Sequence, residues 1–525
     1  MTSTRTSEPG LSAAQRWLLV LSCLAVTLVI ASMAALYTAL PEIAAATGAS
    51  QRQLTWIVDG YTLTLACLVL PAGALGDRFG RRKVLIGGLI AFSLASAVPL
   101  LLDDPVWLIA ARAAAGVGAA LVMPSTLSLL TAGFPEERRG AAVGLWAGIA
   151  GAGAVLGIVG SGLLLAQWSW VSIFLAMTVA GLALTVGAFT VPESVDQDRP
   201  ALDPLGALTA ALAVGLVVIA AIEAPERGWL DPLVLGLFGG GLVAGGLFTL
   251  IELRVRNPML DVRLFADRGF GSGTASITIQ FLISFGTFMI LVQFLQLILG
   301  YAPLTSALAI APMVVPMVAV SAVAPWLADR IGLRWTTLAG LVILGGAMLV
   351  MSRLGTDSSY LQALGPLMIM STGLGLCTAP ATTAIIAGTP EEKHGVAAAV
   401  NDAAREVGAA IGIAIMGSLL AAGYSAKIAP ALPQLPEAAR EPVGDSLAAA
   451  LQVAERAGPQ AQPLADFAKD AFMHGVQQAA LVVGCLTLAA AVLVALWAPG
   501  RRKEPVAEPV AAEPEPVAAA TPGSS

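Results

Sequence analysis

The sequence predicts an all-α integral membrane protein of two six-helix bundles related by pseudo-two-fold symmetry, with two further helices inserted between them. Three observations predict this class. The chain has 525 residues, of which 57% are apolar and only 12% are charged, about half the charged fraction of a soluble domain. Apolar runs of roughly 20 residues, the length of a membrane-spanning helix, alternate with short charged breaks. The sequence of one charged segment between two apolar runs recurs 252 residues later. Such a repeat is typical of a chain with two similar halves.

The repeated break reads LGDRFGRR at residues 75–82 and LADRIGLR at residues 327–334. Its glycines permit a tight turn and close approach of two helices. Asp77 can cap the helix that follows and pair with a basic neighbour. We therefore predict a hinge that breaks and re-forms as the bundles rock, although a positive-inside signal alone would account for the arginines. The hinge residues are Gly73, Gly76, Asp77, Arg78, Gly80, Arg81 and Arg82, with Asp329 and Arg330 in the second copy.

The lengths of the apolar runs predict fourteen spans. They are expected at residues 17–40, 54–76, 83–103, 107–131, 140–165, 170–192, 204–223, 230–251, 269–298, 304–328, 332–353, 359–388, 396–424 and 474–498. The first lacks a small-residue cleavage site, so it is interpreted as a retained span rather than a signal peptide.

The repeat divides these spans into two bundles and an inserted pair, spans 7 and 8, which we expect at the periphery. The divisions are a cytoplasmic N-terminus (1–16), a first bundle (17–192), the inserted pair (193–256), a second bundle (257–498) and a disordered cytoplasmic tail (499–525). The second bundle includes an outside loop at 425–473, in which residues 446–457 predict a short surface helix. The tail is rich in Pro, Ala and Glu and is too polar to pack.

The placement of lysine and arginine predicts the orientation. One set of connections, together with the two termini, holds 19 of these residues. The opposite set holds three in short loops and four in one long loop. We therefore expect both termini in the cytoplasm and the chain in the inner membrane of a bacterium.

Four ionisable residues stand out inside spans, where charge is costly and usually functional. Asp59 in span 2 and Arg112 in span 4 each lie about 9 Å from the outside, at about 1.5 Å per residue. Equal depth and opposite charge predict an ion pair, either a proton-coupling switch or a static structural pair. Asp402 and Glu406 share one face of span 13. A carboxyl group desolvated near mid-membrane can hold a proton near neutral pH, whereas Asp402 could instead be solvated at the cytoplasmic rim.

These features resemble the major facilitator superfamily, in its fourteen-span branch of drug:proton antiporters. The hinge matches that family's signature between spans 2 and 3. Further matches are ALPE at 39–42, WIVDGY at 56–61, LGYAPL at 299–304 and Gly408-x-x-x-Gly412. The resemblance implies alternating access between two bundles, a role in proton coupling for Arg112 and Asp59, and export of drugs or antibiotics.

The chain departs from the family pattern in two ways. In span 5, Gly153 and Gly157 allow close helix packing, but Ile158 stands where the antiporter signature has proline. Ser32 and Met317 stand where some relatives carry aspartate. With fewer membrane acids, we expect a neutral or weakly basic substrate rather than a divalent organic cation.

The sequence gives little support for nucleotide hydrolysis as the energy source, or for metal or disulfide chemistry. The chain has no Gly-Lys step, so it lacks a P-loop and does not use nucleotide hydrolysis. Its two histidines and four dispersed cysteines form no metal or disulfide pattern. We expect no enzyme activity, cofactor, metal or nucleic acid. The expected partners are a small hydrophobic or weakly cationic substrate, protons and the lipid bilayer. The protein is expected to be a monomer. The alternatives are a narrow-specificity exporter of a self-made natural product or metabolite and, in another class, a membrane sensor or enzyme.

Overall fold

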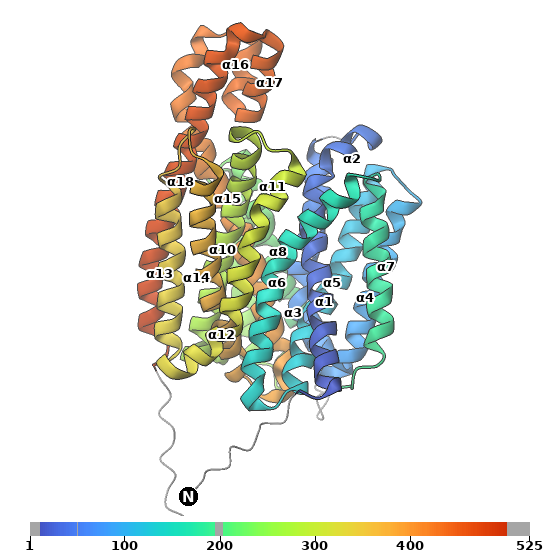
Figure 1. Ribbon diagram of the computed structural model, residues 1–525. Coiled ribbons are helices and arrows are strands. Elements are labelled where there is room, and N and C mark those ends of the chain that lie inside the picture. The colour runs from blue at the N-terminus through green and yellow to red at the C-terminus, as the bar shows by residue number, and fades with distance from the viewer. Residues whose placement is uncertain (1–10, 50, 195–202, 501–525) are drawn as a thin grey trace, which may run out of the picture.

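The computed structural model describes residues 11–49, 51–194 and 203–500. These residues include 14 helices long and apolar enough to cross a membrane, which confirms the predicted fold class (Figure 1). Many large apolar side chains face outward, among them Val186 at 71% and Leu496 at 70% exposed. Such exposure is expected of helices surrounded by lipid rather than water.

Helices of each half pack mainly on one another. The first half contains α1 (Ala13–Ala35), α2 (Leu40–Thr47), α3 (Gln51–Phe79), α4 (Arg81–Ala97), α5 (Pro105–Gly133), α6 (Glu136–Leu165) and α7 (Val171–Ala188). The second contains α10 (Arg268–Gln293), α11 (Pro303–Ile310), α12 (Val314–Ile331), α13 (Leu333–Met351), α14 (Tyr360–Ala387), α15 (His394–Ile428) and α18 (Gln462–Trp497). Helix α3 begins 252 residues before α11 and ends 252 residues before the end of α12, so it corresponds to α11 and α12 together. The domain boundaries themselves stay a prediction.

Several helix starts follow a local signal in the sequence, an aspartate before a proline. Asp104, Asp203 and Asp231 precede α5, α8 (Pro204–Arg227) and α9 (Pro232–Glu252), and each carboxylate accepts a hydrogen bond from a backbone N–H of the first turn. Proline suits the first helical position because its missing N–H would have no partner there. The carboxylate satisfies a donor that would otherwise be unpaired. Residues in the loops therefore fix where these spans begin.

Glycines allow the closest helix crossings. A Cβ on Gly157 of α6 would meet the backbone of Ala31 in α1, and Gly153 lies one turn away against the same helix. In the second half, Gly408 and Gly412 of α15 face the backbone of α10. The backbones approach until only glycine fits, so these positions tolerate no larger residue without separation of the helices.

The inserted pair joins the two halves. Helix α8 packs on both α3 and α15, whereas α9 packs on α8; α8 is seen behind the centre of the molecule in Figure 1. Gly215 of α8 faces Cys67 of α3. Beyond α8, the Trp229 indole N–H donates to the Ser418 hydroxyl of α15 over 2.8 Å. The peripheral position expected for residues 204–251 therefore suits α9, while α8 bridges a seam between the halves.

The region expected as an outside loop, residues 425–473, is mostly helical. Helices α15 and α18 extend past the other spans, and α16 (Glu437–Asp445) and α17 (Leu447–Ala457) form a cap above them (Figure 1). Helix α17 is the predicted surface helix, with Ser446 as its N-cap. The Tyr424 hydroxyl donates to the Val443 carbonyl over 2.8 Å and attaches the cap to α15. We call this end of the molecule the cap end and the opposite end, which carries residues 73–82, the hinge end.

Some expectations fall outside the described residues: most of the N-terminal segment 1–16 and nearly all of the predicted tail 499–525. The four cysteines lie within the described residues and are free. Cys485 is exposed rather than buried, which is tolerable because the surface of a spanning helix faces lipid.

Replacing Gly157 with alanine should destabilise the first half, because the new Cβ would push α6 away from the α1 backbone. Overpacking of this kind typically costs about 1–3 kcal/mol. We expect a lower melting temperature and yield of the purified protein, measured by fluorescence-detected size exclusion after heating. Gly160→Ala is the matched control, since a Cβ there meets nothing within 4 Å. Equal loss in both variants would contradict the packing role of Gly157.

Candidate functional site

A buried ion pair lies at the hinge end of α3 and α4. Asp77 occupies the last turns of α3, and Gly80, with φ of +106°, redirects the chain so that α4 begins at Arg81. Arg81 donates from Nη2 and Nε to Asp77 Oδ1 over 2.9 and 3.1 Å. Each residue is 3% exposed. A buried pair is stable only when its remaining donors and acceptors also find partners.

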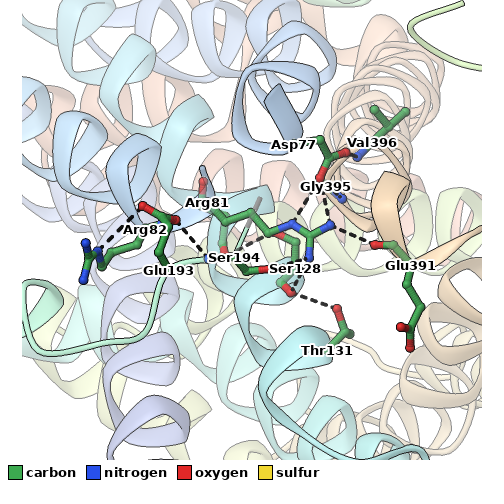
Figure 2. A network of polar contacts seen from close by, with 11 residues as sticks. Asp77, Arg81, Arg82, Ser128, Thr131, Glu193, Ser194, Glu391, Gly395 and Val396 are labelled. Atoms are coloured by element: carbon green, nitrogen blue, oxygen red, sulfur yellow. Dashed lines mark hydrogen bonds and ion pairs between the residues drawn. The ribbon is translucent and has the colours of Figure 1, made fainter. Parts of the chain in front are cut away.

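The other partners of Asp77 come from the second half of the molecule. Its Oδ1 and Oδ2 accept hydrogen bonds from the backbone N–H groups of Gly395 and Val396 over 3.0 and 3.1 Å (Figure 2). The first N–H groups of a helix have no partner within it, and its dipole favours a negative charge. Asp77 therefore caps α15 in the second half. The sequence-based prediction that it caps the following helix, α4, was wrong. This contact joins the two halves.

Arg81 and Arg82 extend this network to the segment after α7. Arg81 donates to the Glu391 carbonyl over 2.9 Å and to the Ser194 hydroxyl over 3.2 Å. The backbone N–H of Arg82 donates to Glu193 Oε1 over 2.9 Å, as Figure 2 shows. A Cβ on Gly80 would collide with the Glu193 carboxylate. The network thus ties together three segments that are distant in sequence.

One glycine of the hinge, Gly73, makes these contacts possible. A Cβ on Gly73 would collide with the backbone of Gly395, whereas a Cβ on Gly76 would make only an ordinary contact, 3.9 Å from Arg81 Cγ. The Arg78 guanidinium lies 5.5 Å from the centre of the Phe79 ring. Gly73 therefore serves the approach of α15 to α3.

A second contact between the halves lies beside this network. Arg139 Nη2 and Glu391 Oε1 are 2.7 Å apart, at positions related by the 252-residue offset. The Arg139 guanidinium holds the pKa of Glu391 below its usual range. The ionised pair therefore persists as the pH falls until that lowered pKa is reached. Because the Glu391 side chain is 73% exposed, the pair contributes little stability.

The second copy of the hinge does not form the same network. Asp329 is exposed, and the Arg330 guanidinium lies 4.2 Å from the Trp326 ring centre. The equivalent crossing exists, since Gly144 of α6 packs on the backbone of Ser321 in α12. However, the two neighbouring helices start at different positions. The start of α15 corresponds, 252 residues earlier, to residue 142, whereas α6 already begins at Glu136. Residue 142 therefore lies inside α6, which runs continuously from Glu136 to Leu165, and not at a helix start that Asp329 could cap.

Arg112 of α5 is held by neutral oxygens instead of a carboxylate. Its Nη1 donates to Ser32 Oγ over 2.9 Å, Nη2 to the Ser32 carbonyl over 3.2 Å, and Nε to the Ile57 carbonyl over 3.1 Å. The guanidinium also lies 4.1 Å from the centre of the Tyr61 ring. Arg112 is 1% exposed, so one buried cation joins α1, α3 and α5.

The ion pair expected between Asp59 and Arg112 does not form in this conformation: no ion pair joins them among the described residues. Ile57 and Tyr61 lie four residues apart and face Arg112. Asp59 lies midway between them in sequence and therefore points to another side of α3. Depth along the helix leaves out the angular position around it, so contact of this pair, directly or through one water, in another state of the protein stays a prediction.

Helix α15 brings charged residues to the centre of the molecule. Asp402 is fully buried, which decides against the solvated position at the rim. The Asn401 amide donates to Asp402 Oδ1 over 3.3 Å and itself accepts a hydrogen bond from Thr382 over 2.9 Å. Asp402 Oδ2 has no hydrogen-bond partner. Glu406 is partly buried one turn farther along α15.

Sequence reasoning gave no role to Arg405 or Trp146. The Arg405 guanidinium lies 5.0 Å from the ring centres of both Trp146 and Phe281, on helices of different halves, and the residue is 1% exposed. Trp146 is the only aromatic residue in the glycine-rich α6, which was a signal available in the sequence. A lone aromatic residue among glycines fills the space that they leave between helices.

Comparisons with known proteins agree with this architecture. A model of the Major Facilitator Superfamily matches residues 22–413. The chain is 33% identical to "Multidrug resistance protein Stp" of Mycobacterium tuberculosis (strain CDC 1551 / Oshkosh), over 87% of each chain. It is 32% identical to "Multidrug efflux pump LfrA" of Mycolicibacterium smegmatis, over 87% of this chain and 91% of that one. The human organic anion transporter MFSD10 shares the fold, with a TM-score of 0.62, 13% identity and coverage of 92% and 100%.

Replacing Asp77 with asparagine should open the hinge end, because it removes the charge that holds Arg81 and the start of α15. Breaking a buried pair in this way typically costs about 3–5 kcal/mol. Spin labels at Phe79 and Ile331, which are 51% and 39% exposed, would report the distance across this end by pulsed electron paramagnetic resonance, with the native cysteines replaced. We expect a longer and broader distance distribution than in the wild type.

The matched control is Asp329→Asn, the equivalent change at the exposed second copy, which should leave the distribution unchanged. A distribution for Asp77→Asn that equals that of the wild type would show that the cap does not hold the halves together.

Proposed function

The chain belongs to the major facilitator superfamily, and from this premise we propose that it is a proton-coupled exporter of hydrophobic drugs or antibiotics. It is a multi-pass membrane transporter and not an enzyme. Its similarity to proteins named for multidrug resistance and efflux supports a drug as the substrate. We place it in the bacterial inner membrane as a monomer, with the hinge end and both termini in the cytoplasm, because lysine and arginine gather on that side.

One observation carries the proposal: a single helix, α15, bears both a buried carboxyl group and the N-terminus that Asp77 caps. Asp402 follows Gly395 by seven residues, about 10 Å along the helix axis. Helix α15 is continuous between these positions. A change of charge at Asp402 that shifts α15 therefore also strains the hydrogen bonds at Asp77. Proton binding and the opening of the hinge end are coupled through one rigid element.

Alternating access follows from this connection. In the conformation described here the hinge network holds the cytoplasmic ends of the halves together. A proton on Asp402 or Glu406 removes a buried negative charge, whereas its loss restores the attraction to Arg405 in low dielectric. The two protonation states thus favour different positions of α15, and a substrate that prefers one position is moved as protons flow in the opposite direction.

A direct test is a susceptibility panel in a pump-deficient host that expresses the full chain, with and without an uncoupler. We expect higher inhibitory concentrations for several hydrophobic drugs and loss of this protection when the proton gradient collapses. Protection that survives the uncoupler would overturn the proton coupling. Absence of protection across the panel would overturn the drug exporter.

Neutralising the membrane acids should separate coupling from folding. We expect Asp59→Asn and Asp402→Asn to abolish pH-driven efflux from proteoliposomes while the protein still inserts and stays monodisperse. The physical reason is that asparagine resembles aspartate in shape but cannot bind and release a proton. Asp103→Asn, at an exposed loop position, is the matched control and should transport normally. Folded Asp59→Asn protein with wild-type coupling would remove Asp59 from the mechanism.

A further inference from the structure

Arg405 is a buried group whose hydrogen-bonding capacity is unused. Its Nε, Nη1 and Nη2 have no hydrogen-bond partner. A guanidinium carries five N–H donors in one plane, and leaving such donors unpaired in a protein interior is costly. Arg405 follows the start of α15 by eleven residues, about 16 Å along the axis. It therefore lies near the middle of the membrane, where transporters of this architecture bind their substrates.

Two aromatic side chains flank this guanidinium. Trp146 comes from α6 in the first half and Phe281 from α10 in the second, each with its ring centre 5.0 Å from Arg405. The Trp146 indole N–H donates to Thr126 over 3.2 Å, which fixes the orientation of the ring. Because the flanking residues belong to different halves, rocking of the halves must change the space beside Arg405.

The charges around Arg405 favour an uncharged ligand. Asp402 and Glu406 on the same helix both act on it electrostatically, yet none of the ion pairs among the described residues includes Arg405. Their negative charge offsets the charge of the guanidinium while its N–H donors stay available. A bound anion would compete with these carboxylates. A neutral carbonyl or hydroxyl oxygen can accept the N–H groups without that competition.

Resting on the proposed function, we propose that Arg405 is a substrate-binding residue that donates hydrogen bonds to a carbonyl or phenolic oxygen of a flat, uncharged aromatic substrate. The substrate's ring system stacks on Trp146 and Phe281 when the two halves part. Stacking on aromatic faces supplies affinity for many ring systems, while the guanidinium selects those that carry an acceptor oxygen. The substrate class is therefore neutral, planar and acceptor-bearing.

The test compares 1-aminoanthraquinone with 1-aminoanthracene, two neutral planar molecules that differ by two ring carbonyls. Binding to the purified full chain in lipid nanodiscs, without a proton gradient, is measured by fluorescence. We expect the wild type to bind the quinone at least tenfold more tightly, the effect of roughly one hydrogen bond to a charged donor. Arg405→Met should reduce this preference to less than twofold and leave the affinity for 1-aminoanthracene within twofold.

Arg353→Met, at an exposed loop arginine, is the matched control and should keep the tenfold preference. Phe281→Leu should weaken both probes equally, and it serves as the second variant if Arg405→Met does not fold. Equal wild-type affinities, no binding of either probe, or a preference that survives Arg405→Met would overturn the proposal. Failure of proton-driven export would appear separately, in the uncoupler and proteoliposome experiments, because the binding assay uses no gradient.

Discussion

The arrangement of the molecule depends on one carboxylate placed at the start of a helix. Asp77 neutralises Arg81 and at the same time satisfies the first N–H groups of α15. Both demands would be expensive to leave unmet in a buried position. The same side chain therefore defines the turn between α3 and α4 and the contact between the two halves. Removing its charge affects both at once, which makes the hinge end a cooperative unit.

The two halves are similar in sequence, but the polar contacts at their two crossings differ. Helices α3 and α12 cross the opposite half in the same manner, with glycine at the point of closest approach. Only at the first crossing does a helix begin where an acidic side chain can cap it. The second crossing is continuous helix on both sides and has no such cap. A duplicated motif thus makes two different contacts between the halves, because the neighbouring helix starts at a different residue.

Sequence reasoning reached the fold because membrane helices are determined by local properties: apolar length, aspartate and proline at helix starts, and glycine at crossings. The repeat also located the hinge. Depth along the helix did not predict the partners of Arg112 in this conformation, because depth leaves out which side of α3 faces α5; a contact between Asp59 and Arg112 in another state stays a prediction. The cap partner of Asp77 and the aromatic pair around Arg405 depend on contacts between helices more than 100 residues apart, which no local pattern contains. Helix α16 was missed because it does not cross the membrane and has no long apolar run.

Helix α8 makes the two seams between the halves unequal. By packing on both α3 and α15 it covers one seam between the halves. Within the described residues, no helix outside the two bundles covers the other seam, between α6 and α12, in this way. Two layers of helix therefore lie over one seam between the halves, and one layer lies over the other. The thickness of protein between the centre of the molecule and its surroundings therefore differs between the two seams.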